Sequence, residues 1–203
     1  MGYSCGMNDD SPALLRSPLL LSRQSSALLV VDLQAKLIPV IPDSRRIVWN
    51  TVRLAEGAEA LGIPIVGTEQ YPTGLGPTVA ELAGRLARVE SKVAFSCGAC
   101  GQLFRDLRER SVEQILVAGL ETHVCVLQTV LDLMTEGFEL FVAVDAVGSR
   151  HSLDRQVALD RMSLAGATLC TTESALFEWC ELAGTPEFKK ISALVRQSPP
   201  DEK

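Results

Sequence analysis

Short, continuous apolar runs alternate along the chain with longer stretches in which apolar positions recur at three- and four-residue steps. Continuous runs are typical of strands covered on both faces, whereas the three- and four-residue spacing is typical of amphipathic helices. The runs predict strands at 27–31, 63–66, 93–95, 115–118, 140–144 and 167–171. The periodic stretches predict helices at 44–61, through 103–107, and at 126–134, 152–165, 175–182 and 186–195.

Local start and stop signals support several of these helices. Pro42, Asp43 and Ser44 precede the first predicted helix, and Gly62 ends it. Thr78–Glu81 has the spacing of a capping box, and Ser152 is a candidate cap. Strands alternating with helices predict an α/β fold, a three-layer α/β/α doubly wound sandwich with a mostly parallel, Rossmann-like sheet. In such sheets ligands bind at the carboxyl ends of the strands.

Length and composition fit one globular domain with a substantial core. The chain has 203 residues, of which 47% are hydrophobic and 22% charged. We expect a flexible N-terminal arm at 1–25, a single domain at 26–197 and a C-terminal tail at 198–203. Five of the six cysteines lie in or beside apolar runs, which is typical of reduced, buried thiols.

Charge and hydropathy narrow the classes of partner and the location. The formal charge is −6, and no cluster of Lys or Arg forms a patch for a phosphate backbone, so nucleic acid is not expected. No uncharged apolar stretch approaches the roughly 18 to 20 residues that span a bilayer, so no membrane association is expected. The N-terminal stretch lacks the pattern of a secretory signal, which makes a cytoplasmic location the expected one. Arg16, Arg23 and several serines leave a mitochondrial presequence open, although two adjacent aspartates count against it.

A turn at 119–126 joins a predicted buried strand to a helix and places Cys125 in the first turn of that helix. Unpaired N–H groups at a helix N-terminus favour a thiolate, so this position predicts a pKa below the free thiol value of about 8.5. Asp32 follows the first strand where a dinucleotide-binding protein would need glycines, and G-x-G-x-x-G is absent there. Both residues fall at the expected ligand-binding edge of the sheet.

Three segments together resemble the signatures of the isochorismatase-like cysteine hydrolase superfamily. They are Val30–Gln34, Lys92 followed by Phe95-Ser96, and Gly119–Val126; stretches around 144–150 and 166–174 resemble the C-terminal part of the family. The resemblance spans about residues 27 to 180 and implies the isochorismatase-like hydrolase fold. It also implies a catalytic triad of Asp32, Lys92 and Cys125.

The resemblance assigns a role to each member of this triad. Cys125 would be the nucleophile, Lys92 would stabilise negative charge as an ammonium, and Asp32 would take the thiol proton and return it to the leaving group. The backbone N–H groups of Glu121 and Cys125 would form an oxyanion hole. A cis peptide between Leu120 and Glu121 would turn the first of them inward.

Other residues near these segments have less specific predicted roles. Gln34, Tyr71, Phe95 and His123 are candidate walls of a substrate pocket. His123 is separated from Cys125 by one residue, a spacing that points the two side chains apart on a helix, so we do not expect a Cys–His dyad. Cys97 and Cys100 have redox or zinc spacing, but no second paired motif exists, and a reduced structural pair is expected.

Nicotinamidases of this superfamily hold a divalent metal with Asp and His residues in the loop after the second strand. The corresponding segment here, 68–77, contains no histidine, so no metal and no cofactor are expected. The segment resembles the metal-free branch that includes isochorismatase domain-containing proteins.

The leading functional hypothesis is a metal-independent cysteine hydrolase that cleaves a C–N bond of a small amide-like molecule through a thioester. A homo-oligomer is expected by the same resemblance. Two other classes stay open: a catalytically idle member that acts as a scaffold through protein contacts, and a nucleotide-binding α/β module. The second would have to bind its ligand without a glycine loop.

Overall fold

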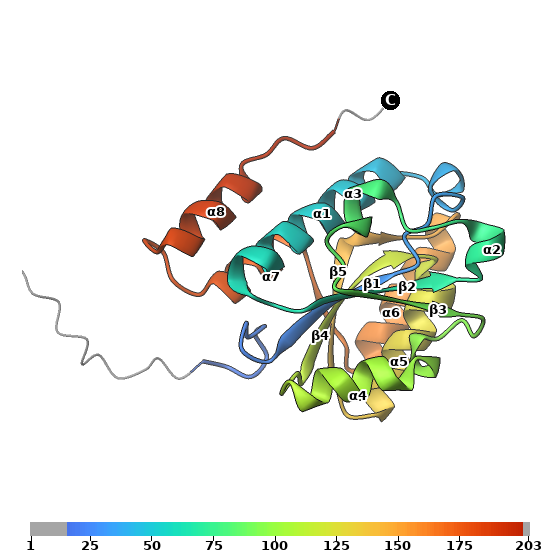
Figure 1. Cartoon of the computed structure of the whole chain (residues 1–203), viewed down its shortest axis with the longest axis horizontal. Coiled ribbons are helices and arrows are strands. Elements are labelled where there is room, and N and C mark those ends of the chain that lie inside the picture. The colour runs from blue at the N-terminus through green and yellow to red at the C-terminus, as the bar shows by residue number, and fades with distance from the viewer. Residues whose placement is uncertain (1–15, 201–203) are drawn as a thin grey trace, which may run out of the picture.

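The structure is a computed structural model that describes residues 16–200. Six parallel strands form one sheet in the order β3-β2-β1-β4-β5-β6, which is the predicted doubly wound α/β arrangement. Helices cover both faces of the sheet, as Figure 1 shows.

The strands are β1 (Ser26–Val31), β2 (Ile65–Gln70), β3 (Arg88–Lys92), β4 (Gln114–Leu120), β5 (Glu139–Gly148) and β6 (Thr168–Cys170). The α-helices are α1 (Ser44–Leu61), α2 (Pro72–Leu75), α3 (Ala80–Ala83), α4 (Gly101–Glu109), α5 (Leu127–Thr135), α6 (Ser152–Ala165), α7 (Thr172–Cys180) and α8 (Pro186–Val195). Two 3₁₀ turns, η1 (Ile38–Val40) and η2 (Cys97–Ala99), and one π-helical turn, η3 (Thr122–Val126), complete the chain.

Two hydrophobic cores sandwich the sheet. Buried residues of α1, α7 and α8 pack on one face, and buried residues of α4, α5 and α6 pack on the other. The two sets of helices lie on opposite sides of the sheet in Figure 1. Every residue of the central strands β1 and β4 is buried, because each has helices on both faces and a strand on both sides. The carboxyl ends of β1 and β4 are therefore held in place by the core on both faces of the sheet.

The third predicted strand is misplaced by a few residues. We expected it at 93–95, but β3 runs from Arg88 to Lys92. Its last pairing joins Lys92 to Gln70, the final residue of β2, so the following residues have no strand beside them. Val93 and Phe95 are 81% and 53% exposed, which shows that apolar character alone did not mark a strand here.

The signals at the helix ends were right at some positions and wrong at others. Gly62 ends α1 in a left-handed conformation, as predicted. The capping box at Thr78 does not form, because the Thr78 N–H and hydroxyl both donate to Glu69 Oε1, at 2.6 and 2.8 Å. Ser152 is the first residue of α6, and the position before it is His151, so Ser152 is not the cap.

The terminal segments fall partly outside the described residues. Residues 1–15 of the predicted arm and 201–203 of the predicted tail are outside them. Within the rest of the arm, Leu21 is fully buried and its N–H donates to Glu178 at 2.9 Å. Between residues 16 and 200, no helix has the length and apolar character that crossing a membrane requires.

Gly119 brings β1 and β4 unusually close at the carboxyl edge of the sheet. Its φ is +146°, and a Cβ at this position would lie 2.1 Å from the carbonyl oxygen of Val31. The pairing of β4 with β5 shifts register at the same point. Only glycine fits here, and the close approach sets the turn after β4 directly beside the end of β1.

We predict that Gly119→Ala lowers the free energy of unfolding by roughly 3 kcal/mol or more, because the methyl group meets backbone in a strained conformation. The matched control is Gly84→Ala, where the added Cβ meets nothing within 4 Å and a change within about 0.5 kcal/mol is expected. Denaturant unfolding measures both. Equal stabilities of the two variants would contradict this account of Gly119.

Candidate active site

Asp32 lies immediately after β1, at the centre of the sheet's carboxyl edge. Its φ is +49°, its side chain is fully buried, and its N–H donates to Thr68 O at 3.1 Å. The Thr68 hydroxyl donates to Asp32 Oδ1 at 2.8 Å. Aspartate tolerates the left-handed conformation better than most residues, which lets the chain turn here while the carboxylate stays inside.

Lys92 ends β3 and reaches across β2 to this carboxylate. Lys92 Nζ lies 2.7 Å from Asp32 Oδ2, and the two side chains are 1% and 0% exposed. The ammonium also donates to Gln70 Oε1 at 2.8 Å and to the Phe95 carbonyl at 2.9 Å. Its three N–H groups therefore have three acceptors, which is the full capacity of a lysine ammonium.

Electrostatics hold Lys92 in its charged form. Burial lowers the pKa of Lys92, but the Asp32 carboxylate raises it through its charge and its hydrogen bond, and the net shift is upward. Lys92 is therefore an ammonium throughout the physiological pH range.

Cys125 lies in the π-helical turn η3 and is 5% exposed. Its thiol lies near enough to Asp32 and Lys92 for the charges of both to act on it, so the ammonium, the carboxylate and the thiol are neighbours at the carboxyl edge. The predicted fall in the pKa of this thiol is wrong. Burial and the Asp32 charge raise the pKa of Cys125 more than Lys92 lowers it, because a thiolate there would lose water and face a like charge. The resting thiol is neutral.

The expected cis peptide before Glu121 is absent, since every peptide bond within residues 16–200 is trans. Glu121 instead turns the chain by adopting a left-handed conformation, with φ +56° and ψ +63°. Its carboxylate accepts a hydrogen bond from Arg150 Nε at 2.8 Å and lies 3.3 Å from His123 Nδ1. The side chain thus anchors the turn that carries Cys125.

The four candidate pocket residues differ in their surroundings. Gln34 is fully buried, and its amide binds the backbone of Gln70 and Gly76. Tyr71 and Phe95 are 57% and 53% exposed. His123 contacts the Ser149 hydroxyl through Nδ1 at 3.0 Å.

Three residues at the site escaped the sequence prediction: Thr68, Gln70 and Cys97. Cys97 Sγ lies 3.3 Å from the Thr68 hydroxyl, and burial raises the pKa of this thiol to about 11 despite the nearby Lys92 ammonium. Cys97 and Cys100 are both free thiols, as expected. Thr68 and Gln70 lie two residues apart near the end of β2, so their side chains share one face of the strand. Their position at the carboxyl end of a predicted strand is the feature of the sequence that could have identified them.

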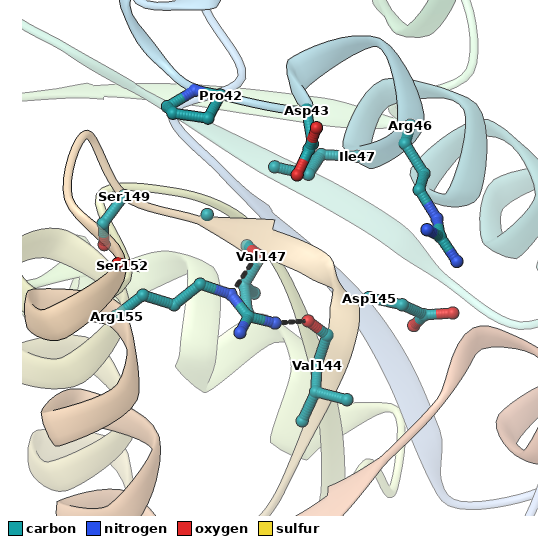
Figure 2. A pocket seen from close by; sticks show the side chains of 11 residues that line it. Pro42, Asp43, Arg46, Ile47, Val144, Asp145, Val147, Ser149, Ser152 and Arg155 are labelled. Carbon is teal, nitrogen blue, oxygen red and sulfur yellow. Dashed lines mark hydrogen bonds between the residues drawn. The ribbon is translucent and has the colours of Figure 1, made fainter. Parts of the chain in front are cut away.

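A cavity of about 400 Å³ opens beside the candidate active site, between α1, the end of β5 and the start of α6. Figure 2 shows Arg155 reaching from α6 to the carbonyls of Val144 and Val147, on the wall of this cavity. Ser149 also lines it and contacts His123. None of the triad side chains lines the cavity.

Within residues 16–200, no three His, Cys, Asp or Glu side chains gather closely enough to hold a metal ion. The side-chain groups that donate hydrogen bonds to the Asp32 carboxylate are the Lys92 ammonium and the Thr68 hydroxyl.

Comparison of the sequence with known protein families identifies the family of this chain. The sequence model of the isochorismatase domain matches residues 26–174. The chain belongs to the isochorismatase family. Isochorismatase domain-containing protein 2A of Mus musculus is 42% identical over 178 residues, which cover 88% of this chain and 86% of the relative.

Solved structures of family relatives share the fold. The structure of MAR1 ribonuclease from Caenorhabditis elegans has a TM-score of 0.84 at 38% identity and covers 90% of this chain and 95% of its own. The YcaC gene product of Escherichia coli, described as an octameric hydrolase of unknown specificity, has a TM-score of 0.81 at 26% identity, with 88% and 90% coverage.

We predict that Asp32→Asn accelerates alkylation of Cys125 by iodoacetamide at pH 7.5 by about tenfold or more. The substitution removes a negative charge that raises the pKa of the thiol, while the Lys92 ammonium that lowers it remains. Lys92→Met should slow the reaction for the opposite reason. Mass spectrometry of the peptide that contains Cys125 measures both rates.

The matched control is Asp145→Asn, because Asp145 is another carboxylate on a strand and raises the pKa of Cys170. It should leave the alkylation of Cys125 unchanged. An Asp32→Asn protein that reacts no faster than wild type would show that the carboxylate does not hold the thiol neutral.

Proposed function

We propose that this chain is a cysteine hydrolase that cleaves the C–N bond of a small amide-like molecule. Membership of the isochorismatase family supports a hydrolase in general. The finer proposal rests on one observation: a buried carboxylate contacts an ammonium, at 2.7 Å, and lies near enough to the Cys125 thiol to raise its pKa.

In the first half-reaction Asp32 accepts the Cys125 proton as sulfur attacks the carbonyl carbon of the substrate. The C–N bond then breaks, the nitrogen takes the proton from Asp32, and an amine or ammonia leaves behind a thioester on Cys125. A neutral resting thiol suits this sequence, because the nucleophile forms only when a substrate is in place. Lys92 supports the thiolate and the carboxylate as each carries charge.

In the second half-reaction water attacks the thioester carbon and gives its proton to Asp32. The carboxylic acid product leaves, and the proton returns to the sulfur, which restores the resting thiol. The backbone N–H groups of Glu121 and Cys125 are the proposed oxyanion hole for both tetrahedral intermediates. The left-handed backbone at Glu121 sets the direction of the first of these groups.

The proposed chemistry uses no metal and no cofactor. Its support is the donor set around the Asp32 carboxylate, which consists of the Lys92 ammonium and the Thr68 hydroxyl. An ammonium held against the carboxylate already supplies the positive charge that the proposed reaction needs.

A small-molecule substrate fits the buried triad better than a polymer does. The related Caenorhabditis elegans protein is named a ribonuclease, which makes RNA the natural competing substrate. The formal charge of −6 opposes binding to a phosphate backbone. RNA therefore belongs in the assay as a competing outcome.

We also propose that the chain forms a homo-oligomer and acts in the cytoplasm. The octameric Escherichia coli relative supports the assembly. Leu153, Val157 and Leu164 expose 72%, 48% and 89% of their surface along α6, and such a stripe is costly to leave in water.

We predict that the wild-type protein releases ammonia or an amine from at least one member of a panel of primary amides and ureides, and that a chelator does not reduce the rate. Cys125→Ala should lower kcat/KM by at least about 1,000-fold, because the nucleophile is lost. Cys180→Ala in α7 is the matched control and should retain activity, since Cys180 lies in the core on the α1 face. Coupled ammonia detection and product mass spectrometry measure the rates.

Four results would overturn the proposal. Activity that survives Cys125→Ala would show that Cys125 is not the nucleophile. Activity abolished by the chelator would show that the reaction requires a metal. Cleavage of an RNA oligonucleotide that depends on Cys125, without amide hydrolysis, would favour a nuclease. An intact but inert protein with no substrate in the panel would favour a scaffold.

A further inference from the structure

The side-chain amide of Gln70 belongs to the candidate site through its hydrogen bond to Lys92. Gln70 is the last residue of β2 and pairs in register with Lys92 on β3. Its Oε1 accepts a hydrogen bond from Lys92 Nζ at 2.8 Å, and the residue is 9% exposed.

The ammonium of Lys92 is oriented by two neutral acceptors and one charged acceptor. The Phe95 carbonyl and Gln70 Oε1 take two of its N–H groups, and Asp32 Oδ2 takes the third. The three donors of an ammonium diverge tetrahedrally, so fixing two of them fixes the direction of the third. The two neutral acceptors therefore aim the remaining N–H at Asp32.

The direction of the Gln70 amide is itself determined by its neighbours. Its Nε2 donates to the Val93 carbonyl at 2.8 Å, which leaves Oε1 to face Lys92. The backbone of Gln70 is held by Gln34, whose Oε1 accepts from the Gln70 N–H at 2.8 Å and whose Nε2 donates to the Gln70 carbonyl at 3.1 Å. A second donation from Gln34 to Gly76 O, at 2.7 Å, ties this pair to the loop that follows.

We infer that Gln70 is a positioning residue for the proposed hydrolysis: its amide oxygen holds the Lys92 ammonium against Asp32. This inference rests on the proposed function for its catalytic meaning, but the aiming of the ammonium can be tested without any substrate. Gln70 acts through Lys92 and is assigned no contact with substrate.

A neutral amide suits this position for an electrostatic reason. A carboxylate at residue 70 would add a second negative charge beside the ammonium and compete with Asp32 for it. It would also oppose formation of the Cys125 thiolate, and it could not donate to the Val93 carbonyl. Glutamine supplies the acceptor for Lys92 and the donor for Val93 without adding charge.

The test compares Gln70→Leu, which removes the acceptor, with Gln70→Glu, which keeps an acceptor but adds charge. Each rate of Cys125 alkylation by iodoacetamide is measured from pH 6 to pH 10 alongside wild type and Lys92→Met. Both Gln70 variants should shift the profile toward higher pH and lower the rate at pH 8 by about tenfold, which corresponds to one pKa unit.

Gln114→Leu is the matched control. Gln114 is a buried glutamine at the start of β4, at the opposite end of that strand from η3, where its amide bonds Ser22, Ser26 and Glu139. Its loss should lower the thermal midpoint without moving the alkylation profile. A structural role alone for Gln70 would give the same pattern as this control.

The outcomes separate the inference from the proposed function. Unshifted profiles in both Gln70 variants, or an unshifted profile in Lys92→Met, would overturn the positioning role even if amides are hydrolysed. Shifted profiles with no hydrolysis of any amide would support the positioning role and count against the proposed reaction. If Gln70→Leu does not fold, Gln70→Met, which also lacks the acceptor for Lys92 and adds no charge, replaces it under the same criterion.

Discussion

The ion pair between Lys92 and Asp32 is the interaction on which the rest of the candidate site depends. Both side chains are almost completely removed from water, with a separation of 2.7 Å between Nζ and Oδ2. Burying two charges costs several kcal/mol for each, and the attraction between them offsets this cost only if every remaining donor and acceptor is satisfied. Thr68, Gln70 and the Phe95 carbonyl meet that condition. The polar network around the pair is thus a requirement of burial as well as of chemistry.

The same pair also affects the protonation of the Cys125 thiol: Asp32 raises its pKa and Lys92 lowers it. The position of Cys125 after β4 suggests an activated cysteine at a helix N-terminus, but burial and the adjacent carboxylate outweigh that contribution and keep the thiol protonated. The neighbouring thiol of Cys97 is subject to the same effect of burial. The resting thiol therefore keeps its proton near the carboxylate. In the proposed hydrolysis this proton passes to Asp32 when the carbonyl group of a substrate binds.

Sequence reasoning reached the main features of this arrangement because they depend on chain order. Continuous apolar runs located five of the six strands, and the doubly wound topology brings Asp32 and the turn of Cys125 to one edge of the sheet. The assignment of Lys92 to the site depended on the family resemblance, because a single lysine forms no sequence pattern that indicates a function. The structure brings it into contact with Asp32.

The remaining features depend on three-dimensional detail that a sequence does not display. Thr68 and Gln70 contact the pair because β2 lies between β1 and β3, and that register is known only after folding. The pKa of Cys125 is raised by burial and by the Asp32 charge, and neither is visible in the sequence. The expected cis peptide was wrong, since a left-handed Glu121 turns the chain with trans bonds. The end of β3 was misplaced because exposed Val93 and Phe95 look apolar in sequence yet extend past the last pairing.

The most direct test of the central claim is nitrogen-15 NMR of the Lys92 side chain in protein labelled at lysine. The account predicts a protected ammonium signal that persists at pH 9, and that changes strongly in Asp32→Asn, since a buried N–H donor has then lost its charged acceptor. A neutral amine at pH 9, or an ammonium signal unaffected by Asp32→Asn, would contradict the buried ion pair on which the site is built.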